Sequence, residues 1–193
     1  MNRVCVFCGS SHGRNPAYAS AARALGRALA ARHIGVVYGG GNVGLMGVLA
    51  DAVLEAGGRI TGVIPHALVA RELAHQGLTE LHVVDSMHER KAMMARLADA
   101  FVALPGGFGT LEEFAEAVTW TQLGLQAKPC GLLNVAGFYD GLLGFLAHAL
   151  EDEFLRPTHS DIVVADTDPS ALLDRLDAWK APDVTRWISL GEQ

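Results

Sequence analysis

The regular alternation of two kinds of segment constrains the fold of this sequence more than any other feature. Short apolar or β-branched runs of strand length alternate with alanine-rich segments long enough for a helix. We expect strands at residues 4–8, 35–38, 59–64, 81–84, 100–104, 130–134 and 161–164. We expect helices at residues 16–32, 45–56, 87–98, 111–125, 138–153 and 169–179. This alternation predicts a doubly wound, Rossmann-like α/β fold with a mostly parallel sheet flanked by helices.

The length of the chain favours one folded unit. With 193 residues, of which 50% are hydrophobic, the chain can bury one sizeable core but is short for two. We therefore expect a single α/β domain at residues 1–180 and a C-terminal tail at residues 181–193. Pro182 would break the last helix at the start of this tail, which either packs through Trp187 or frays.

Charge and cysteine usage exclude several classes of partner. A formal net charge of −6 provides no broad basic field, so we expect no nucleic-acid partner. The apolar stretches are too short for a secretory signal or a membrane span, and we expect a cytoplasmic protein without membrane contact. Cys5 and Cys8 should lie on opposite faces of the first strand as buried thiols. The eight histidines show no ligand spacing, so no metal is expected.

The first of two glycine-rich turns spans residues 38–47. Gly39, Gly41 and Gly44 satisfy the pattern G-x-G-x-x-G between a predicted strand and a predicted helix. A dinucleotide site would also need an acidic residue at the end of the following strand, and residues 59–65 end without one. Two interpretations therefore stay open: a tight turn that lets helix and strand approach closely, or a cradle for a mononucleotide.

The second glycine-rich turn spans residues 104–113. Thr110 and Glu113 fit a capping box, with Thr110 as the N-cap of the next helix. Glycines before Thr110 leave backbone amides open, and the helix dipole adds positive potential, which together predict an anion site at the amides of Gly109, Thr110, Leu111 and Glu112. Gly109 occupies the place of the Walker lysine, so the turn favours one phosphate monoester over a triphosphate with magnesium.

Two adjacent cations follow the fourth predicted strand. Ser86 and Glu89 fit a capping box, which gives Glu89 a structural role, and helical spacing puts Arg90 on one face with Met94 and Leu97. Arg90 and Lys91 are either a solvated surface pair or ligand contacts. Their position near the predicted phosphate turn favours ligand contacts, because arginine can hold a phosphate through two parallel hydrogen bonds.

Two of these segments together resemble a known signature. Met-His-Glu-Arg-Lys at residues 87–91, followed by Pro-Gly-Gly-Phe-Gly-Thr-Leu-Glu-Glu at residues 105–113, is similar to the paired motif of the Lonely Guy (LOG) family of cytokinin riboside 5′-monophosphate phosphoribohydrolases. The resemblance runs from the first predicted strand through Gly9-Ser10-Ser11 and the first glycine-rich turn, and is looser after Pro157. Members of this family have often been labelled lysine decarboxylases.

The resemblance implies an activity and a set of residues. The activity is hydrolysis of the N-glycosidic bond of AMP or N6-substituted adenosine 5′-monophosphates such as cytokinin riboside 5′-monophosphates, giving the free base and ribose 5-phosphate. Arg90 and Glu113 match the catalytic residues of the family. The residues that match its substrate contacts are Glu72, Arg90, Lys91, Gly107, Phe108, Gly109, Thr110, Leu111, Glu112, Glu113 and Thr119. The resemblance also implies at least a homodimer with active sites near the interface.

The chemistry of this reaction suggests roles for the two candidate catalytic residues. Positive charge develops on the ribose as the base departs, which requires a nearby carboxylate and an oriented water. Glu113, expected in the first helical turn, would be charged and act as a base or an electrostatic stabiliser. Arg90 would bridge phosphate and sugar or donate to the departing base, and no residue stands out as a general acid.

Three alternative functions can be weighed from the sequence. A nucleotide-binding carrier protein of the same fold would bind the monophosphate without chemistry. A nicotinamide-dependent dehydrogenase lacks the acidic residue named above. A lysine decarboxylase needs a lysine that forms a Schiff base with pyridoxal phosphate, and of the lysines only Lys91 is expected near the site. We therefore expect a hydrolase without a cofactor.

Overall fold

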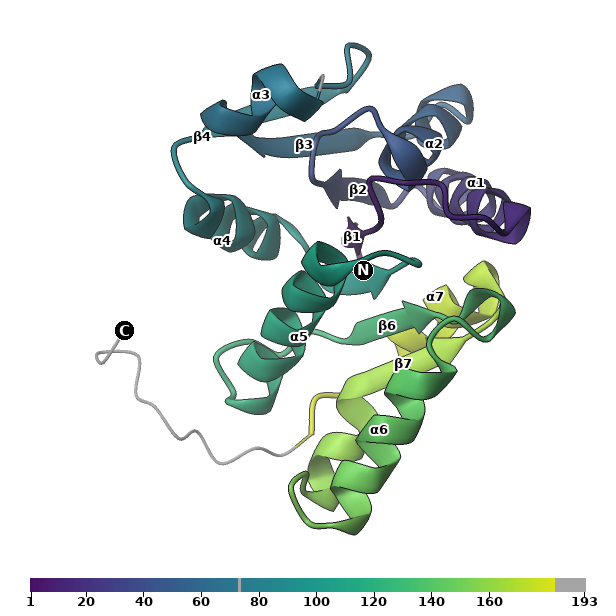
Figure 1. The fold of residues 1–193 in the computed structure, drawn as a ribbon, viewed down its shortest axis with the longest axis vertical. Coiled ribbons are helices and arrows are strands. Elements are labelled where there is room, and N and C mark those ends of the chain that lie inside the picture. The colour runs from purple at the N-terminus through teal and green to yellow at the C-terminus, as the bar shows by residue number, and fades with distance from the viewer. Residues whose placement is uncertain (73, 183–193) are drawn as a thin grey trace.

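The computed structural model describes residues 1–72 and 74–182, which form one twisted sheet with helices on both faces (Figure 1). Within these residues the sheet has seven strands, all parallel, in the order β4-β3-β2-β1-β5-β6-β7. The strands are β1 Arg3–Phe7, β2 Gly35–Tyr38, β3 Ile60–Pro65, β4 Glu80–Val84, β5 Ala100–Ala103, β6 Cys130–Leu133 and β7 Val163–Asp166. The predicted doubly wound parallel sheet is confirmed.

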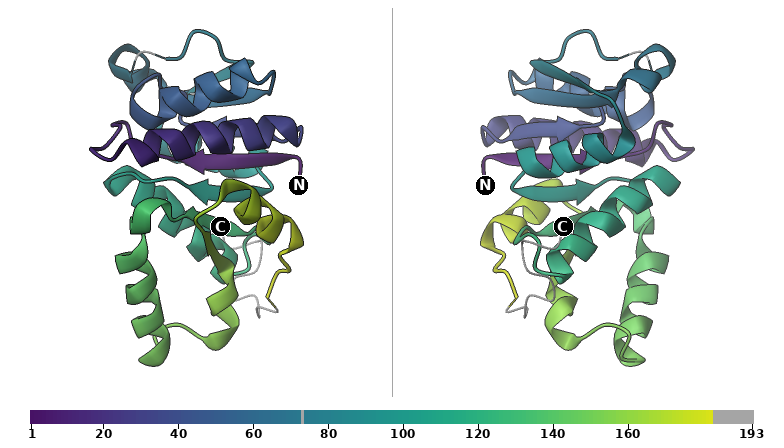
Figure 2. Two further views of the ribbon diagram at one scale, coloured as in Figure 1. Left: turned by 90° about the vertical axis from the view of Figure 1, so that its right-hand side faces the viewer. Right: turned by 90° about the vertical axis from the view of Figure 1, so that its left-hand side faces the viewer.

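The helices form two layers. They are α1 Pro16–Ala31, α2 Gly44–Glu55, α3 His66–Glu72, α4 Met87–Leu97, α5 Phe108–Gln122, α6 Asp140–Glu151 and α7 Pro169–Ala178, with short 3₁₀ turns η1 Val135–Gly137 and η2 Pro157–Ile162. Helices α1, α2 and α7 pack on one face of the sheet, and α4, α5 and α6 pack on the other (Figure 2). Across residues 1–72 and 74–182, no helix combines the length and apolar character needed to cross a membrane.

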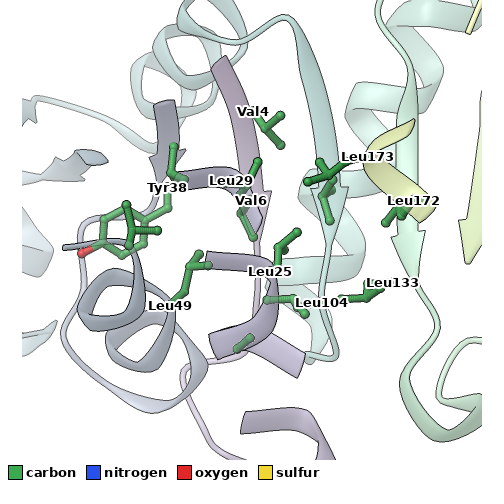
Figure 3. Packing of buried hydrophobic residues seen from close by; sticks show 14 of the residues in the cluster. Val4, Val6, Leu25, Leu29, Tyr38, Leu49, Leu104, Leu133, Leu172 and Leu173 are labelled. Carbon is green, nitrogen blue, oxygen red and sulfur yellow. The ribbon is translucent and has the colours of Figure 1, made fainter. Parts of the chain in front are cut away.

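Helix α1 illustrates how the sequence builds these layers. Asn15 caps it by accepting a hydrogen bond from the Ala17 amide at 3.0 Å, and Pro16 supplies a first helical residue that needs no amide partner. Apolar side chains spaced three and four residues apart, including Leu25 and Leu29, then form one buried face. Figure 3 shows this face packed with residues of β1, β2, α2 and α7, in the hydrophobic core on that side of the sheet.

The main departures from the predicted elements are at three places. Helix α3 was not predicted, because residues 66–72 carry no clear cap and directly follow Pro65. Residues 161 and 162 belong to η2, so β7 begins at Val163 instead. Helix α5 begins at Phe108, three residues before the predicted start at 111, because glycine-rich sequence is a poor local signal for helix. The prediction for Trp187 lies outside the described residues.

The strand order positions the functional site. From β1 the sheet grows in one direction through β2, β3 and β4, and in the other through β5, β6 and β7. The chain leaves the carboxyl end of β1 toward one face of the sheet and the carboxyl end of β5 toward the other. This divergence opens a crevice between the two strands, where sheets of this kind bind ligands. The turns after these two strands are joined by a hydrogen bond from the Gly9 amide to the Pro105 carbonyl at 3.0 Å.

Candidate active site

A cleft of about 260 Å³ lies at the carboxyl ends of β1, β2 and β5. It is the crevice expected at the point where the strand order reverses. Three connections wall it: the turn after β1, the first glycine-rich turn after β2, and the second glycine-rich turn with the start of α5. Its lining residues are Val6, Phe7, Cys8, Gly9, Ser10, Gly39, Met46, Met87, Arg90, Gly107, Phe108, Gly109, Thr110, Glu112 and Glu113.

The start of α5 differs from the predicted capping box. Gly107 is the N-cap and makes no side-chain cap bond, so Thr110 is the third helical residue and is buried. The interpretation of Thr110 and Glu113 as a capping box is therefore wrong. Gly106 explains the geometry, because a Cβ atom there would collide with the Thr110 side chain and lie 2.9 Å from the Gly9 amide nitrogen. The turn can close on the β1 turn only with glycine at 106.

The earlier helix start also moves the predicted anion site. The amide of Leu111 donates to the Gly107 carbonyl at 3.1 Å, and the amide of Glu112 lies one residue further into the helix, so neither is open, contrary to the prediction. The amides of Phe108, Gly109 and Thr110 stand at the start of the helix, where no carbonyl of a preceding helical turn is present to accept their hydrogen bonds. Added Cβ atoms at Gly107 and Gly109 would meet nothing within 4 Å, so the backbone here borders open space. The amides and the helix terminus form a site suited to an anion.

Glu113 is the sixth residue of α5, beyond the first turn where we expected it. The effect of the helix dipole falls off within one turn, so the dipole contributes little to the electrostatics of this carboxylate. Its neighbouring cation is Arg90, whose Nη1 lies 3.6 Å from the Glu113 Oε1. The two side chains are 9% and 12% exposed, so this ion pair forms one wall of the cleft largely away from solvent.

Arg90 is held from several directions. Ser86 caps α4 by accepting from the Glu89 amide at 3.1 Å, and the Glu89 carboxylate accepts from the Asp85 amide, which confirms a structural role for Glu89. Arg90 is then buried with its Nε donating to the Val63 carbonyl at 3.1 Å and its Nη2 to the Gly39 carbonyl at 3.4 Å. The interpretation of Arg90 as a solvated surface residue is therefore wrong.

Lys91 is not among the residues that line the cleft, although its partner Glu112 is. Its Nζ lies 2.5 Å from the Glu112 carboxylate and 3.1 Å from the Glu116 carboxylate, which ties α4 to α5. Burial alone would lower the pKa of Lys91, but hydrogen bonds and charge from the two glutamates outweigh it and raise the pKa. Lys91 is thus a fully charged link between the helices at neutral pH.

Two other predicted site residues, Leu111 and Thr119, are not found in the cleft. Leu111 faces an apolar hollow with Phe138 and Leu142 instead of the cleft. Thr119 is exposed and donates from Oγ1 to the Ala115 carbonyl at 2.8 Å, about 9 Å along α5 from Glu113. Glu72 is the last residue of α3, and its side chain lies outside the described part of the structure. The cleft therefore gathers Arg90, Glu113 and most of residues 107–112.

The first glycine-rich turn borders the cleft through Gly39, and its later residues pack against the turn after β1. Gly44 has a φ of +57°, and a Cβ there would fall on the backbone of Ser10 and Ser11. The Leu45 amide donates to the Gly9 carbonyl at 3.0 Å, which holds this turn against the turn after β1. Of the two open interpretations, these contacts favour close packing of backbone over a ligand cradle.

Several residues that line the cleft were not predicted. Cys8 and Ser10 follow β1, and Met46 and Met87 come from α2 and α4. Cys5 and Cys8 do pack toward opposite faces of the sheet, as expected. Burial, with a smaller effect from the charge of Glu113, raises the pKa of the Cys8 thiol far above its usual range, so the cleft contains a neutral thiol. The rule that ligands bind beyond strand ends would have identified Cys8 and Ser10.

Comparison with known proteins gives a consistent set of relatives. The family profile described as "Possible lysine decarboxylase" matches residues 46–176. A cytokinin riboside 5′-monophosphate phosphoribohydrolase of Arabidopsis thaliana is 48% identical over 179 residues, which cover 93% of this chain and 83% of the relative. A protein of Oryza sativa subsp. japonica, named a "probable" enzyme of the same activity, is 52% identical over 93% of this chain and 79% of its own length.

Solved structures resemble this chain in fold. The molybdenum cofactor carrier protein of Chlamydomonas reinhardtii superposes with a TM-score of 0.71 at 21% identity, over 93% of this chain and 99% of that protein. The molybdenum cofactor binding protein of Rippkaea orientalis gives a TM-score of 0.70 at 21% identity, over 92% and 96% of the two chains. At this level of identity the resemblance extends to the architecture alone.

Proposed function

This chain belongs to the family described as "Possible lysine decarboxylase", and from its similarity to relatives named cytokinin riboside 5′-monophosphate phosphoribohydrolases we propose that it is a phosphoribohydrolase. It hydrolyses the N-glycosidic bond of adenosine 5′-monophosphates, N6-substituted ones such as cytokinin riboside 5′-monophosphates or AMP itself, to the free base and ribose 5-phosphate. The observation that carries this proposal is the buried pair of Arg90 and Glu113 beside the open amides of residues 108–110. Opposite charges and an anion site meet in one cleft.

The anion site suits the 5′-phosphate of the substrate. Amides at the start of α5 can donate to phosphate oxygens, and Gly107 and Gly109 leave the room that a phosphate needs to approach the backbone. The site contains no lysine of the Walker type, so a single monoester is favoured over a triphosphate. A phosphate held here puts the attached ribose within reach of the next turn of α5, where Glu113 lies.

The reaction uses the charges of the pair in different ways. Water adds its oxygen to C1′ of the ribose as the bond from C1′ to the base nitrogen breaks, and a proton passes to the departing base. The Glu113 carboxylate stabilises positive charge on the ribose ring and orients or deprotonates the water. The Arg90 guanidinium balances the phosphate or the negative charge that builds on the base. Burial strengthens both effects because little water screens them.

The family description as a decarboxylase does not fit this cleft. Amino-acid decarboxylation through pyridoxal phosphate requires a lysine that can form a Schiff base. Within the described part of the chain, the residues that line the cleft include no lysine. Lys91 is bound to two carboxylates, and Lys128 donates to the Ala95 carbonyl at 2.7 Å. We derive no step through this cofactor and propose that the hydrolysis needs none.

A chromatographic assay tests the proposal. The purified protein is incubated with AMP and with isopentenyladenosine monophosphate, and we expect release of free base and ribose 5-phosphate from at least one of them. Saturable binding without release of base would instead indicate a nucleotide carrier. Comparing the two rates decides whether the cleft prefers adenine or a substituted adenine.

Glu113→Gln separates catalysis from binding. Gln keeps the size of Glu but carries no charge, so we expect kcat to fall by at least about 10²-fold, the usual scale of a general-base contribution. Loss of this charge beside buried Arg90 should also lower the free energy of unfolding, so urea denaturation must show that the variant is folded under the assay conditions. Arg90→Ala should lower turnover as well. Near-normal turnover in Glu113→Gln would remove this residue from the mechanism.

We propose that the active protein is at least a homodimer. The resemblance gives Thr119 a substrate contact, yet Thr119 is exposed and lies outside the cleft of its own chain, so it would reach the substrate of a second copy. Exposed aromatic surface supports association, because Phe108 is 93% exposed at the cleft and Phe145 is 64% exposed on α6. Light scattering of the purified chain tests this assembly, and a monomer that hydrolyses its substrate at full rate contradicts it.

We also propose a cytoplasmic location. The three cysteines, Cys5, Cys8 and Cys130, are free thiols, which is usual for proteins kept in a reducing compartment. Fractionation of cells that express the protein, followed by immunodetection, tests this location.

A further inference from the structure

The guanidinium of Arg90 fills the place where the pairing of two strands stops. The last paired residues of β2 and β3 are Tyr38 and Gly62, and β3 continues to Pro65 beside β4 alone. Beyond that last pair, Arg90 donates to the Val63 carbonyl of β3 and to the Gly39 carbonyl that follows β2. The side chain therefore bridges the two strands in place of a backbone ladder.

Gly39 provides the room for this guanidinium. A Cβ atom added at Gly39 would overlap Nη2 of Arg90, and it would lie 3.3 Å from Cζ of Arg90 and 3.5 Å from Sδ of Met46. The φ angle of Gly39 lies outside the left-handed region, unlike those of Gly40 and Gly44. An L-residue could therefore adopt the backbone of Gly39 without strain, and the obstacle to a side chain is Arg90 itself.

We propose that Gly39 is a positioning residue for the reaction, whose missing side chain is the space that holds Arg90 against Glu113. This inference rests on the proposed role of Arg90 in turnover. A methyl group at Gly39 pushes the guanidinium away from the two carbonyls. Because Met87 and Glu113 flank its other side at 3.7 Å and 3.6 Å, the displaced guanidinium enters the cleft or separates from Glu113.

The experiment compares Gly39→Ala in three backgrounds: the natural chain, Arg90→Lys and Arg90→Ala. Arg90→Lys keeps a positive charge but lacks the Nη2 atom that would collide with the new methyl group, and Arg90→Ala removes the group altogether. For each chain the urea midpoint of unfolding is measured, with kcat and KM for the better of the two nucleotide substrates. Gly144→Ala, at an exposed position of α6 with nothing within 4 Å, controls for the exchange of glycine for alanine.

With Arg90 present, we expect Gly39→Ala to lower kcat at least about 10-fold and to lower the urea midpoint. In the Arg90→Lys background the same exchange should change kcat less than about 2-fold, and in the Arg90→Ala background it should leave the midpoint unchanged. Equal losses in all backgrounds would overturn the inference, as would a shift of the midpoint without any change in kcat. The dependence of the urea midpoint of Gly39→Ala on the residue at position 90 is measured without any turnover. It therefore tests the contact between Gly39 and Arg90 even if the proposed activity is wrong.

Discussion

The two glycine-rich turns have similar composition but use their glycines in opposite ways. In the first turn, residues 39–47, neighbouring protein atoms occupy the space beside the glycines: Arg90 beside Gly39, and the backbone of Ser10 and Ser11 beside Gly44. In the second turn, residues 104–113, Gly106 packs against Thr110 and Gly9, but Gly107 and Gly109 border open space at the cleft. The first turn packs the protein together, whereas the second leaves backbone available to a ligand.

This difference shows how glycine should be interpreted in sheets of this kind. A glycine removes a side chain, and the structure decides whether protein or ligand takes the freed volume. Where protein takes it, substitution should mainly cost stability, and at Gly39 it should cost turnover as well because the displaced group is Arg90. Where open space remains, substitution should mainly cost ligand affinity. The following variants test this division, beginning with the largest expected effect.

Gly44→Ala should cause the largest loss. The new Cβ would fall on the backbone of Ser10 and Ser11, and the residue would have to keep a φ of +57°. We expect the free energy of unfolding to fall by about 3 kcal/mol, the range for strain combined with overpacking. Urea denaturation monitored by circular dichroism measures this loss.

Gly57→Ala is the matched control for Gly44→Ala. Gly57 has a similar φ of +73°, but nothing lies within 4 Å of its added Cβ. We expect it to cost only about 1 kcal/mol, from backbone conformation alone. Equal losses at the two positions would mean that close packing of the first turn contributes nothing.

Gly107→Ala should affect the ligand and leave the fold intact. Its φ of −98° suits alanine, and the new methyl group would extend into the open space where the phosphate is proposed to bind. We expect kcat/KM to fall about 10-fold, equivalent to about 1.4 kcal/mol, while the free energy of unfolding changes by less than about 0.5 kcal/mol. Unchanged kcat/KM would indicate that the phosphate lies elsewhere.

Lys91→Met should have the smallest effect, on the link between α4 and α5. Two carboxylates lie within 3.1 Å of Nζ, but Glu112 is half-exposed, so we expect a loss of about 1 kcal/mol in the free energy of unfolding. The folded state raises the pKa of Lys91, so this contribution is complete below the unfolded pKa near 10.4 and is lost as pH rises through the folded value.

The pH dependence of the loss in unfolding free energy tests this prediction for Lys91→Met. Urea denaturation of Lys91→Met and the natural chain should differ at pH 7 and converge at strongly alkaline pH. If KM for the nucleotide rises 10-fold instead while stability is unchanged, Lys91 contacts the substrate directly, as the resemblance implies.

Much of the fold could be predicted because its signals are local. Seven apolar runs gave the seven strands, and helical periodicity gave six of the helices, within a few residues at their ends. Helix α3 escaped prediction because residues 66–72 form too short a segment for periodicity to show. The start of α5 was placed too late because Phe108 and Gly109 have no local preference for helix, and the packing of Gly106 on Gly9 sets the turn.

The candidate site was predicted only in part. Glycine density and the two cations identified the second turn and Arg90, and motif resemblance identified Glu113. Cys8 and Ser10 were missed as cleft residues although they follow a predicted strand end, and Gly39 was considered only as part of the first glycine-rich turn. Lys91 was grouped with Arg90 because the two are adjacent in sequence, although helix geometry points neighbouring side chains about 100° apart.

The sequence by itself determined the parallel sheet, the two turns at the carboxyl ends of its strands and a glycine-rich connection into a helix after β5. These features follow from periodicity and glycine content, which act over a few residues. Tertiary structure alone decided that Arg90 is buried against Glu113 and that Gly39 makes room for it. Those contacts join β2, β3, α4 and α5, and the strand order that brings these elements together depends on the packing of the whole sheet.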